Sequence, residues 1–578
     1  MGLWPHSLPA RSAIRRVRPS DPGWPSQESW KRLNDSVGGN LLPVDFPLAA
    51  CQSDLGGTAC KSLFANVANP YWLGDQPGLT ESFGWVDAWV TRPSVRAVAA
   101  TSAVDIAEAV NFARENDLRL VVKGGGHSYQ GTSDAPDSLL VWTRHMNDIT
   151  LHSDFVPHGC TGAAPEPAVT IGAGCVWADA YDAVTTRAGR YVQGGGCMTV
   201  GVPGLIQSGG FSSFSKHYGL AAASLLEAEV VTADGRIRTA NACQDSALFW
   251  ALKGGGGGTF GVVSSVTVRV HPLPEFFDYS NFTVRASSDD AYRRLLRDFV
   301  AFYRESLFND HWGEQAHCSP SNRLTLRMVG QGLDPAQTRA AWQPFLSLLA
   351  RSPQAYTIES QPSIGAMPAR GWWNPADNPS LVADPRPGAL SSHLWWRGDG
   401  TQSGMVLHAY ESLWLPASLL ADSEQARLAE ALFEASRHWE VQLHFNKGLA
   451  GAPRAVIDAA RDTATNPAVL TAFALAIIAG GEAPAYPGMA DREPNVIRAR
   501  KSRAAVHQSM SALRAIAPVG GSYVSESDFF ESDWQRSFWG SNYPRLAAIK
   551  KKYDPEGLFF VHHGVGSENW SADGFTKL

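Results

Sequence analysis

The stretch VVKGGGHSYQG, residues 121–131, constrains the fold of this chain more strongly than any other segment. Two β-branched residues and a lysine lead into Gly124, Gly125 and Gly126, and His127 follows directly. Three adjacent glycines cost backbone entropy and form helices and strands poorly. They are typical of a turn at which the backbone comes very close to another group. The His127 imidazole is then held at the edge of whatever approaches.

Two more glycine-rich segments follow along the chain, VQGGGCMTVGVPGLIQSGGF at 192–211 and LFWALKGGGGGTFGVV at 248–263. The run at 253–261 is not a phosphate-binding P-loop, because no Lys-Ser/Thr pair follows its glycines. The first stretch does not match the dinucleotide fingerprint, since no obvious helix opens after it. One such loop alone favours a structural turn. Several together indicate backbone wrapped around a long, flat, anionic ligand.

Residues 85–275 carry the pattern of a compact α+β unit. From Ser102 onward, apolar residues recur with helical spacing and predict an amphipathic helix: Val104, Ile106, Val110 and Ala113. The strand LRLVV follows and ends at the first glycines, which makes this part a β-α-β unit. Further along, LLEAEVVTADGRIRTA predicts a hairpin that turns at its Asp-Gly pair, residues 234–235.

Residues 276–505 change character and predict a second domain. Helical stretches such as DDAYRRLLRDFVAFYRES alternate with runs of strand pattern such as SGMVLHAYESLWLP and WEVQLHFNKG. This pattern is typical of an antiparallel sheet with helices on one face. The apolar run LTAFALAIIAG, residues 470–480, is too short to span a bilayer, and we expect a buried helix there. Residues 1–84 form an N-terminal arm and extension, and 506–578 form a C-terminal segment.

The composition is that of an ordinary globular protein with ample core, since 44% of the residues are hydrophobic and 18% are charged. The net charge of −6 comes without a basic block, so neither nucleic acid nor a membrane is an expected partner. None of the seven cysteines lies in a CxxC pair or a zinc-like cluster, and we expect no metal. Cys51 and Cys60 flank a glycine-containing loop and are either a disulfide or free buried thiols.

Four motifs together resemble a known family. VVKGGGHSYQGTS, VQGGGCMTVGVPGLIQSGGF, HYGLAAASLLEAEVVTADGRI and LFWALKGGGGGTFGVV stand in the order seen in berberine-bridge-enzyme-like oxidases, which belong to the vanillyl-alcohol-oxidase group of FAD enzymes. The C-terminal SFWGSNYPRLAAIKKKYDPEGLFF resembles the closing segment of that subfamily. The resemblance implies a two-part FAD-binding domain of the PCMH type over 85–275, a substrate-binding domain over 276–505, and a segment over 506–578 that returns to the FAD domain.

The resemblance also implies how FAD is held. In such enzymes the histidine of the first motif is bonded covalently to the flavin 8-methyl group, which here is His127. Cys197 matches the cysteine that is bonded to flavin C6 in the doubly linked members; by itself it would be a small core residue. The other implied cofactor contacts are Gly124, Gly125, Gly126, Ser128, Gly131, Thr199, Val200, Gly201, Gly204, Gly209, Gly210, Val262 and Asn542.

The electron acceptor is inferred from the residue three positions after the linking cysteine. In the related oxidases this residue controls the access of dioxygen to the flavin, and here it is Val200, the smaller choice. Val200 therefore favours an oxidase that reduces dioxygen to hydrogen peroxide. The alternatives are that Val200 only packs a strand, and that the protein is a dehydrogenase.

Candidate catalytic residues lie in two places. Strand alternation in EVQLHFNKG puts His444 on a polar face, which is either a wall over the flavin or a solvated face. In GSYVSESDFF the family's Tyr is replaced by Glu526, although Tyr523 survives. Either Tyr523 or Glu526 is expected to take a proton, with Lys447 as a cationic neighbour. The terminal pair, His562 and His563, either approaches the flavin or lies on the surface.

Substrate and location depend on weaker signals. Trp faces stack on sugars and aromatic rings, although more often they are core; the tryptophans concerned are Trp372, Trp373, Trp395, Trp396 and Trp414. The first hypothesis is an oxidase of an alcohol or saccharide carbon. The second is a dehydrogenase or C–C bond-forming oxidase for a phenolic or alkaloid-like molecule, and the third is a non-catalytic protein that retains FAD. A Cys51–Cys60 disulfide would favour a secreted or periplasmic protein over a cytoplasmic one.

Overall fold

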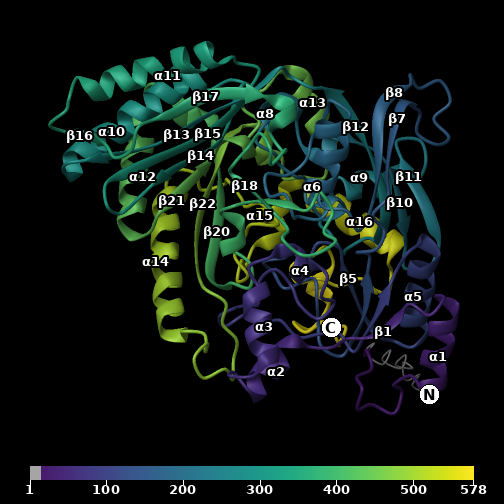
Figure 1. The fold of residues 1–578 in the computed structure, drawn as a ribbon. Helices are drawn as coiled ribbons and strands as arrows, with labels where there is room; N and C mark the ends of the chain where they lie inside the picture. The colour runs from purple at the N-terminus through teal and green to yellow at the C-terminus, as the bar shows by residue number, and fades with distance from the viewer. Residues whose placement is uncertain (1–14) are drawn as a thin grey trace, which may run out of the picture.

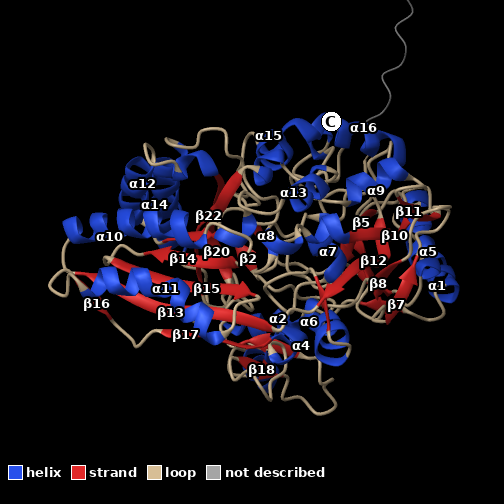
Figure 2. Ribbon diagram, turned by 90° about the horizontal axis from the view of Figure 1, so that it is seen from above, coloured by secondary structure: helices blue, strands red, loops and turns tan. Residues whose placement is uncertain are grey.

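The protein is described by a computed structural model that covers residues 15–578, so part of the predicted N-terminal arm, residues 1–14, lies outside the described chain. Two smaller sheets lie on one side of the molecule and one large sheet on the other (Figures 1 and 2). The cavity described below is lined from both sides. The α+β fold class predicted from the sequence is confirmed. Among residues 15–578, no helix combines the length and the apolar character that crossing a bilayer requires.

The first small sheet has three parallel strands and one antiparallel edge strand. Its order is β1 (Leu41–Pro43), β4 (Arg96–Ala99), β6 (Ser138–Trp142) and β5 (Arg119–Lys123). Helix α5 (Ala103–Glu115) joins β4 to β5, as predicted. It begins after Ser102, whose hydroxyl accepts from the Asp105 N–H while Asp105 bonds back, a capping box that fixes the helix start. Val104, predicted to face the core, is 56% exposed, because the buried face is set by Ile106, Val110 and Ala113 instead.

The second small sheet is antiparallel. Its order is β11 (Ile237–Asn241), β10 (Leu225–Val231), β12 (Val262–Pro272), β8 (Glu166–Gly172) and β7 (Ile149–Phe155), and β9 (Arg190–Val192) pairs with β12. The predicted hairpin is confirmed as β10–β11. Its turn places Gly235 in the left-handed region at φ 74°, which glycine adopts without a Cβ penalty.

The large sheet is antiparallel over almost all of its width. Its order is β16 (Tyr356–Ile358), β13 (Phe276–Ala286), β15 (Arg323–Gln331), β14 (Trp312–Cys318), β21 (Val441–His444), β22 (Ala472–Glu482), β20 (Val406–Pro416), β2 (Gly84–Trp85) and β3 (Trp89–Val90), with β17 (Ser363–Pro368) on β13. One layer of helices packs on it, as Figure 2 shows: α10 (Asp289–Phe302), α12 (Gln425–His438) and α14 (Val496–Arg514). The predicted helix-covered antiparallel sheet is therefore confirmed.

The expectation of a buried helix at 470–480 is wrong, because this run forms strand β22. Alternate residues enter two different cores. Ala474, Ala476 and Ile478 pack under the helices, whereas Leu475 and Ile477 pack in a separate cluster on the opposite face. A strand buried on both faces is apolar at every position, so its sequence lacks the alternation that identifies a half-buried strand.

The N-terminal extension and the C-terminal segment tie the two sides together. The extension supplies β1 to the first small sheet and β2 to the large one. In the C-terminal segment, α16 (Tyr543–Tyr553) carries Lys550, whose buried ammonium donates to the carbonyl oxygens of Thr259 and Phe559 at 2.6 and 2.7 Å. Lys550 therefore fixes this segment against the glycine-rich loop that precedes β12.

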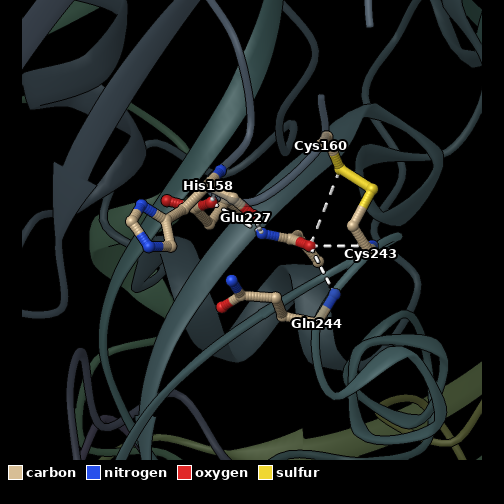
Figure 3. The surroundings of a disulfide bond; sticks show 6 residues. His158, Cys160, Glu227, Cys243 and Gln244 are labelled. Carbon is tan, nitrogen blue, oxygen red and sulfur yellow. Dashed lines mark hydrogen bonds between the residues drawn. A yellow bond between two sulfur atoms is a disulfide. The ribbon is translucent and has the colours of Figure 1, made fainter. Parts of the chain in front are cut away.

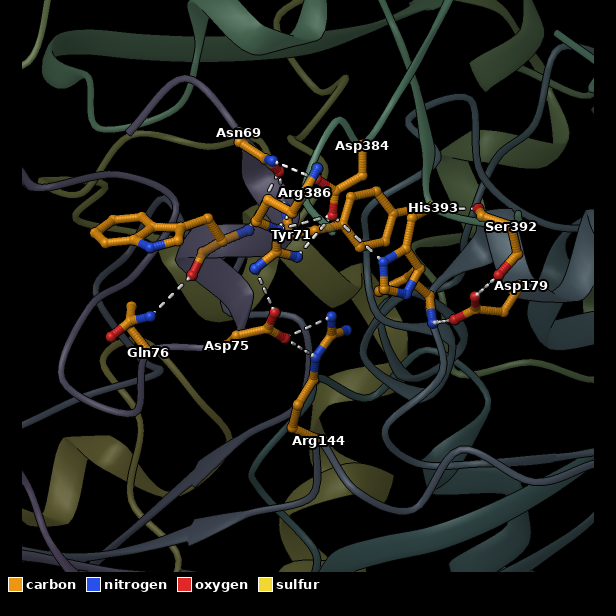
Figure 4. Close-up of polar contacts among 12 residues, drawn as sticks. Asn69, Tyr71, Asp75, Gln76, Arg144, Asp179, Asp384, Arg386, Ser392 and His393 are labelled. Atoms are coloured by element: carbon orange, nitrogen blue, oxygen red, sulfur yellow. Dashed lines mark hydrogen bonds and ion pairs between the residues drawn. The ribbon is translucent and has the colours of Figure 1, made fainter. Parts of the chain in front are cut away.

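A partly buried polar network anchors the loop between β18 (Leu381–Ala383) and β19 (Leu394–Trp396) to the extension (Figure 4). Arg386 donates to Asp384 and to Asp75. Arg144, which follows β6, donates to the same Asp75 at 2.9 Å. Burial acts to raise the pKa of Asp384, but hydrogen bonds from Arg386 and Asn69 outweigh it and lower that pKa to about 2. The network fixes a loop that continues directly into the wall of the cavity.

Two disulfides are present. Cys51–Cys60 closes a short loop in the extension, so this pair is a disulfide rather than two free buried thiols. The sequence does not predict the disulfide Cys160–Cys243, because its cysteines stand 83 residues apart. It pins the loop after β7 to the end of β11 (Figure 3), where Asn241 accepts the N–H groups of Cys243 and Gln244 at 2.8 Å each.

We expect the two disulfides to differ in their contribution to stability. In the chain-entropy account a longer closed loop constrains the unfolded chain more, which gives about 4.5 kcal/mol for Cys160–Cys243 and roughly 2.7 kcal/mol for Cys51–Cys60. The double variant Cys160→Ser/Cys243→Ser should therefore have a lower thermal unfolding midpoint than Cys51→Ser/Cys60→Ser. Equal midpoints, or the reverse order, would contradict the assignment of the larger role to Cys160–Cys243.

Candidate active site

A cavity of about 1220 Å³ lies where the two sides of the molecule meet. One wall is built from the glycine-rich segments that follow β5 and β9 and precede β12. The opposite wall comes from β13, β14, β15 and β21 of the large sheet, and the C-terminal segment closes one end. The cavity exceeds the range of about 300–1,000 Å³ that is usual for small-molecule sites. It has room for an extended cofactor together with a substrate.

Two glycine loops touch backbone to backbone at the cavity wall. A Cβ on Gly125 would lie 2.6 Å from the Gly201 nitrogen, and a Cβ on Gly201 would lie 2.8 Å from the Gly125 nitrogen. Real Cβ atoms do not approach that closely, so only glycine allows this contact. Gly204, one turn further on, lines the cavity with open space where its Cβ would stand. This part of the wall is bare backbone, as the close approach of a flat ligand requires.

The contact between the loops brings His127 and Cys197 close together, so that Thr199 contacts both side chains. The Thr199 hydroxyl lies 3.1 Å from His127 Nε2 and 3.6 Å from Cys197 Sγ. Both side chains line the cavity. Burial, and then the charge of Asp399, raise the pKa of Cys197 above its usual range, so this thiol is protonated at neutral pH.

The cavity wall fits a polar cofactor such as FAD. Seven buried polar side-chain atoms of the cavity lining have no hydrogen-bond partner within residues 15–578: Gln130 Oε1, Gln207 Oε1, Thr259 Oγ1, Ser280 Oγ, Asp399 Oδ2, Asn446 Oδ1 and His563 Nδ1. A buried polar atom without a partner costs about 1–3 kcal/mol, and native proteins leave few of them. A ligand with many polar groups along its length would supply the missing partners.

Most of the expected cofactor contacts line this cavity, namely Gly124, Gly125, Gly126, His127, Ser128, Cys197, Val200, Gly201 and Gly204. Thr199 stands directly behind them through its two side-chain contacts. Five lie away from the lining: Gly131, Gly209, Gly210, Val262 and Asn542. Two of them make other contacts within the protein. Gly131 packs on the Trp89 ring, and the Asn542 amide donates to the Thr465 carbonyl oxygen at 2.9 Å.

All five candidate catalytic residues line the cavity: Tyr523, Glu526, His444, Lys447 and Val200. Lys447 Nζ lies 2.5 Å from each carboxylate oxygen of Glu526, which makes a tight, partly buried ion pair. Burial, and then the Glu526 charge, raise the pKa of Tyr523, so its phenol stays protonated and acts as a donor. Burial, and then the Lys447 charge, lower the pKa of His444 far below its usual value, so its ring is neutral.

Glu314 is a further cavity residue that sequence patterns do not identify. It lies on β14 with φ 65°, the left-handed region that a side chain rarely adopts, and so it departs from the regular alternation of a strand. Its carboxylate accepts from the Ser213 hydroxyl at 2.5 Å and from the Asn446 amide at 3.4 Å. Burial raises the pKa of Glu314, although the Ser213 hydroxyl acts against the rise.

The aromatic candidates divide between wall and core. His562 and His563 line the cavity rather than the surface, and the His562 ring stacks on Phe529 with centroids 3.7 Å apart. Three of the five tryptophans line it: Trp372, Trp373 and Trp396. The other two, Trp395 and Trp414, are core residues.

The family models and a curated relative agree with this architecture. Residues 95–241 match the family model described as an FAD binding domain, and residues 522–566 match the one described as berberine and berberine like. Over 600 residues the chain is 31% identical to the FAD-linked oxidoreductase easE of Trichophyton verrucosum, covering 97% of this chain and 92% of that one. The chain belongs to this family of FAD-linked oxidoreductases.

Solved structures place the family within the vanillyl-alcohol-oxidase type. The VAO-type flavoprotein MtVAO615 of Myceliophthora thermophila C1 superposes with a TM-score of 0.77 at 27% identity, covering 97% of this chain and 99% of that one. The glucooligosaccharide oxidase of Acremonium strictum shares the fold, with a TM-score of 0.62 at 19% identity, covering 84% of this chain and 94% of that one. This member of the family is an FAD-dependent oxidoreductase, as the motifs predicted.

Proposed function

We propose that this FAD-linked oxidoreductase carries FAD attached through both His127 and Cys197 and acts as an oxidase. The observation that carries the proposal is their common contact with Thr199 at the cavity wall, 3.1 Å from His127 Nε2 and 3.6 Å from Cys197 Sγ. The structure of the glucooligosaccharide oxidase is described as containing 6-S-cysteinyl, 8α-N1-histidyl FAD, which supports the same pair of links here.

FAD bound in this cavity would take a hydride from a substrate carbon and pass the two electrons to dioxygen, which yields hydrogen peroxide. The chain supplies the setting for that chemistry. The bare backbone at Gly125, Gly201 and Gly204 lets a flat ring system lie against the wall. Two covalent links keep the cofactor in place even when the substrate side of the cavity is open to solvent.

Glu526 is proposed as the group that takes the hydroxyl proton of the substrate. Among residues 15–578 its carboxylate is held by Lys447 alone, whereas that of Glu314 already accepts from Ser213 and Asn446. Tyr523, protonated and on the same wall, is suited to donate a hydrogen bond to the substrate oxygen. The neutral His444 ring beside Lys447 adds a polar group without adding charge.

The proposed substrate is an alcohol or saccharide that presents an oxidisable C–OH carbon. Trp372 and Trp396 offer apolar ring surface on the cavity wall, which suits the face of a sugar or an aromatic ring. A phenolic or alkaloid-like substrate is the second candidate. It is favoured by the stacked pair Tyr129 and Tyr410, whose centroids lie 5.0 Å apart on the same wall and would receive an aromatic ring.

Val200 supports dioxygen over another acceptor. It is half-buried and lines the cavity three residues after Cys197, and a valine leaves more room than an isoleucine or leucine there. The proposal therefore favours an oxidase over a dehydrogenase.

A secreted or periplasmic location is part of the proposal. The disulfides Cys51–Cys60 and Cys160–Cys243 support it, because disulfides form and persist in oxidising compartments and are rare in the cytosol.

The reaction is tested by adding a panel of sugars, simple alcohols, phenols and amines to the purified protein and following oxygen uptake together with hydrogen peroxide. An oxidase releases one peroxide for each substrate molecule that it oxidises. The same panel is repeated without oxygen in the presence of a quinone-like dye. Turnover with the dye and none with dioxygen would replace the oxidase by a dehydrogenase.

Glu526→Gln should slow the reduction of the bound flavin by substrate by about 10²-fold or more, because the amide is nearly isosteric but does not take a proton. Flavin content should be unchanged. Stopped-flow absorbance under anaerobic conditions measures the step. Glu314→Gln is the matched control and should retain most of the rate. A larger loss in Glu314→Gln than in Glu526→Gln would transfer the proposed role to Glu314.

A further inference from the structure

The segment from Trp396 to Gly404 lies across both proposed attachment points of the cofactor. The Trp396 indole donates to the carbonyl oxygen of Gly196, the residue before Cys197, at 2.9 Å. At the other end of the segment, the Ser403 hydroxyl donates to Glu81 Oε1 at 2.7 Å, and the Gly404 N–H donates to the Glu81 carbonyl oxygen at 2.6 Å. One short loop therefore contacts Gly196, next to Cys197, and Glu81, near His127.

Glu81 stands behind His127. It is only 7% exposed, and its second oxygen, Oε2, lies 3.9 Å from His127 Nε2. Thr199 approaches the same ring nitrogen. His127 Nδ1 has no hydrogen-bond partner among the described residues, so Nδ1 is the nitrogen left free to bond to a ligand. A buried carboxylate requires hydrogen-bond partners; Glu81 Oε1 has one in the Ser403 hydroxyl, and Oε2 is the oxygen that faces His127.

Asp399 lies in the segment whose Trp396 is hydrogen-bonded to Gly196, the residue before Cys197. Asp399 and Cys197 both line the cavity, and Asp399 Oδ2 is buried without a hydrogen-bond partner among residues 15–578. Burial raises the pKa of Asp399 to about 6, and the adjacent Cys197 thiol opposes that rise. Burial also raises the pKa of the Cys197 thiol above its usual range. A thiol bonds to carbon through its thiolate, so Cys197 needs a proton acceptor at this place.

We propose that Glu81 and Asp399 are the proton acceptors for the attachment of FAD to this chain, Glu81 for His127 and Asp399 for Cys197. The inference rests on the proposed function, since it requires that both links form. Each carboxylate acts on a side chain next to it, so the two links are served by separate groups. The segment that carries Asp399 also orients Glu81 through Ser403.

The chemistry of each link balances with dioxygen as the oxidant. At His127, Nδ1 bonds to the 8-methyl carbon, Glu81 takes the proton from Nε2, and the methyl group loses one hydrogen as a proton. At Cys197, Asp399 takes the thiol proton, the sulfur bonds to C6, and the hydrogen on C6 leaves as a proton. In each case two electrons remain on the ring system. One dioxygen takes the two electrons and two protons and becomes hydrogen peroxide.

The test uses the full chain, prepared with little bound flavin, mixed with FAD in air and sampled over time. Flavin that stays with acid-precipitated polypeptide is counted, and mass spectrometry of the digested protein assigns it to the His127 or the Cys197 peptide. Glu81→Gln should slow the His127 link by about 10²-fold or more and leave the Cys197 link nearly unchanged. Asp399→Asn should show the opposite selectivity.

Three further measurements separate proton transfer from a structural effect. Asp377→Asn makes the same carboxylate-to-amide change at another cavity residue, one that is exposed, and should leave both links at the parent rate. Ser403→Ala removes the hydroxyl that orients Glu81 and should slow the His127 link alone, by less than Glu81→Gln does. Raising the pH should speed the impaired link in each carboxylate variant, because hydroxide then takes the proton.

The outcomes distinguish a failure of the proposed function from a failure of the proton acceptors alone. If the parent chain forms only one link or none, the proposed function fails. If both links form in the parent and at the same rate in Glu81→Gln and Asp399→Asn, only the present inference fails. It also fails if each variant loses both links equally and higher pH restores neither, because that pattern indicates a general disturbance of the site.

Discussion

The contact between Gly125 and Gly201 is the constraint on which the rest of the active site depends. Each backbone occupies the space where a Cβ of the other residue would stand. The contact holds the loop after β5 against the loop after β9, and Thr199 then lies between His127 and Cys197. Since the two loops leave different sheets, the same contact also joins the two halves of the FAD-binding part. A cofactor linked at both positions would bridge this junction covalently.

The large sheet, the C-terminal segment and the segment Trp396–Gly404 complete the site from the other side. Strands β14 and β21 bring Glu314 and His444 to the cavity, and the C-terminal segment brings Tyr523 and Glu526. The Asp384–Arg386 network fixes the loop that leads to the segment Trp396–Gly404. The catalytic wall is therefore assembled from four separate parts of the chain.

Local signals made part of this predictable. The capping residue Ser102, the Asp-Gly turn at 234–235 and the glycine runs each act within a few residues, and each was identifiable from the sequence. Strand β22 was not, because burial on both faces removes the alternation that identifies a strand. The Cys160–Cys243 disulfide and the left-handed backbone of Glu314 are products of tertiary packing. Glu81 and Asp399 lie outside the motifs altogether and come near His127 and Cys197 only through the fold.

The central claim is that one FAD is bonded to both His127 and Cys197, and the denatured, unreduced protein tests it most directly. Its intact mass should exceed that of the polypeptide by one FAD. Of the seven cysteines, four form disulfides and three are free, so attachment at Cys197 leaves two thiols to react, Cys175 and Cys318. An unmodified mass with three reactive thiols would contradict the account. A flavin-bearing mass with three reactive thiols would exclude the link at Cys197.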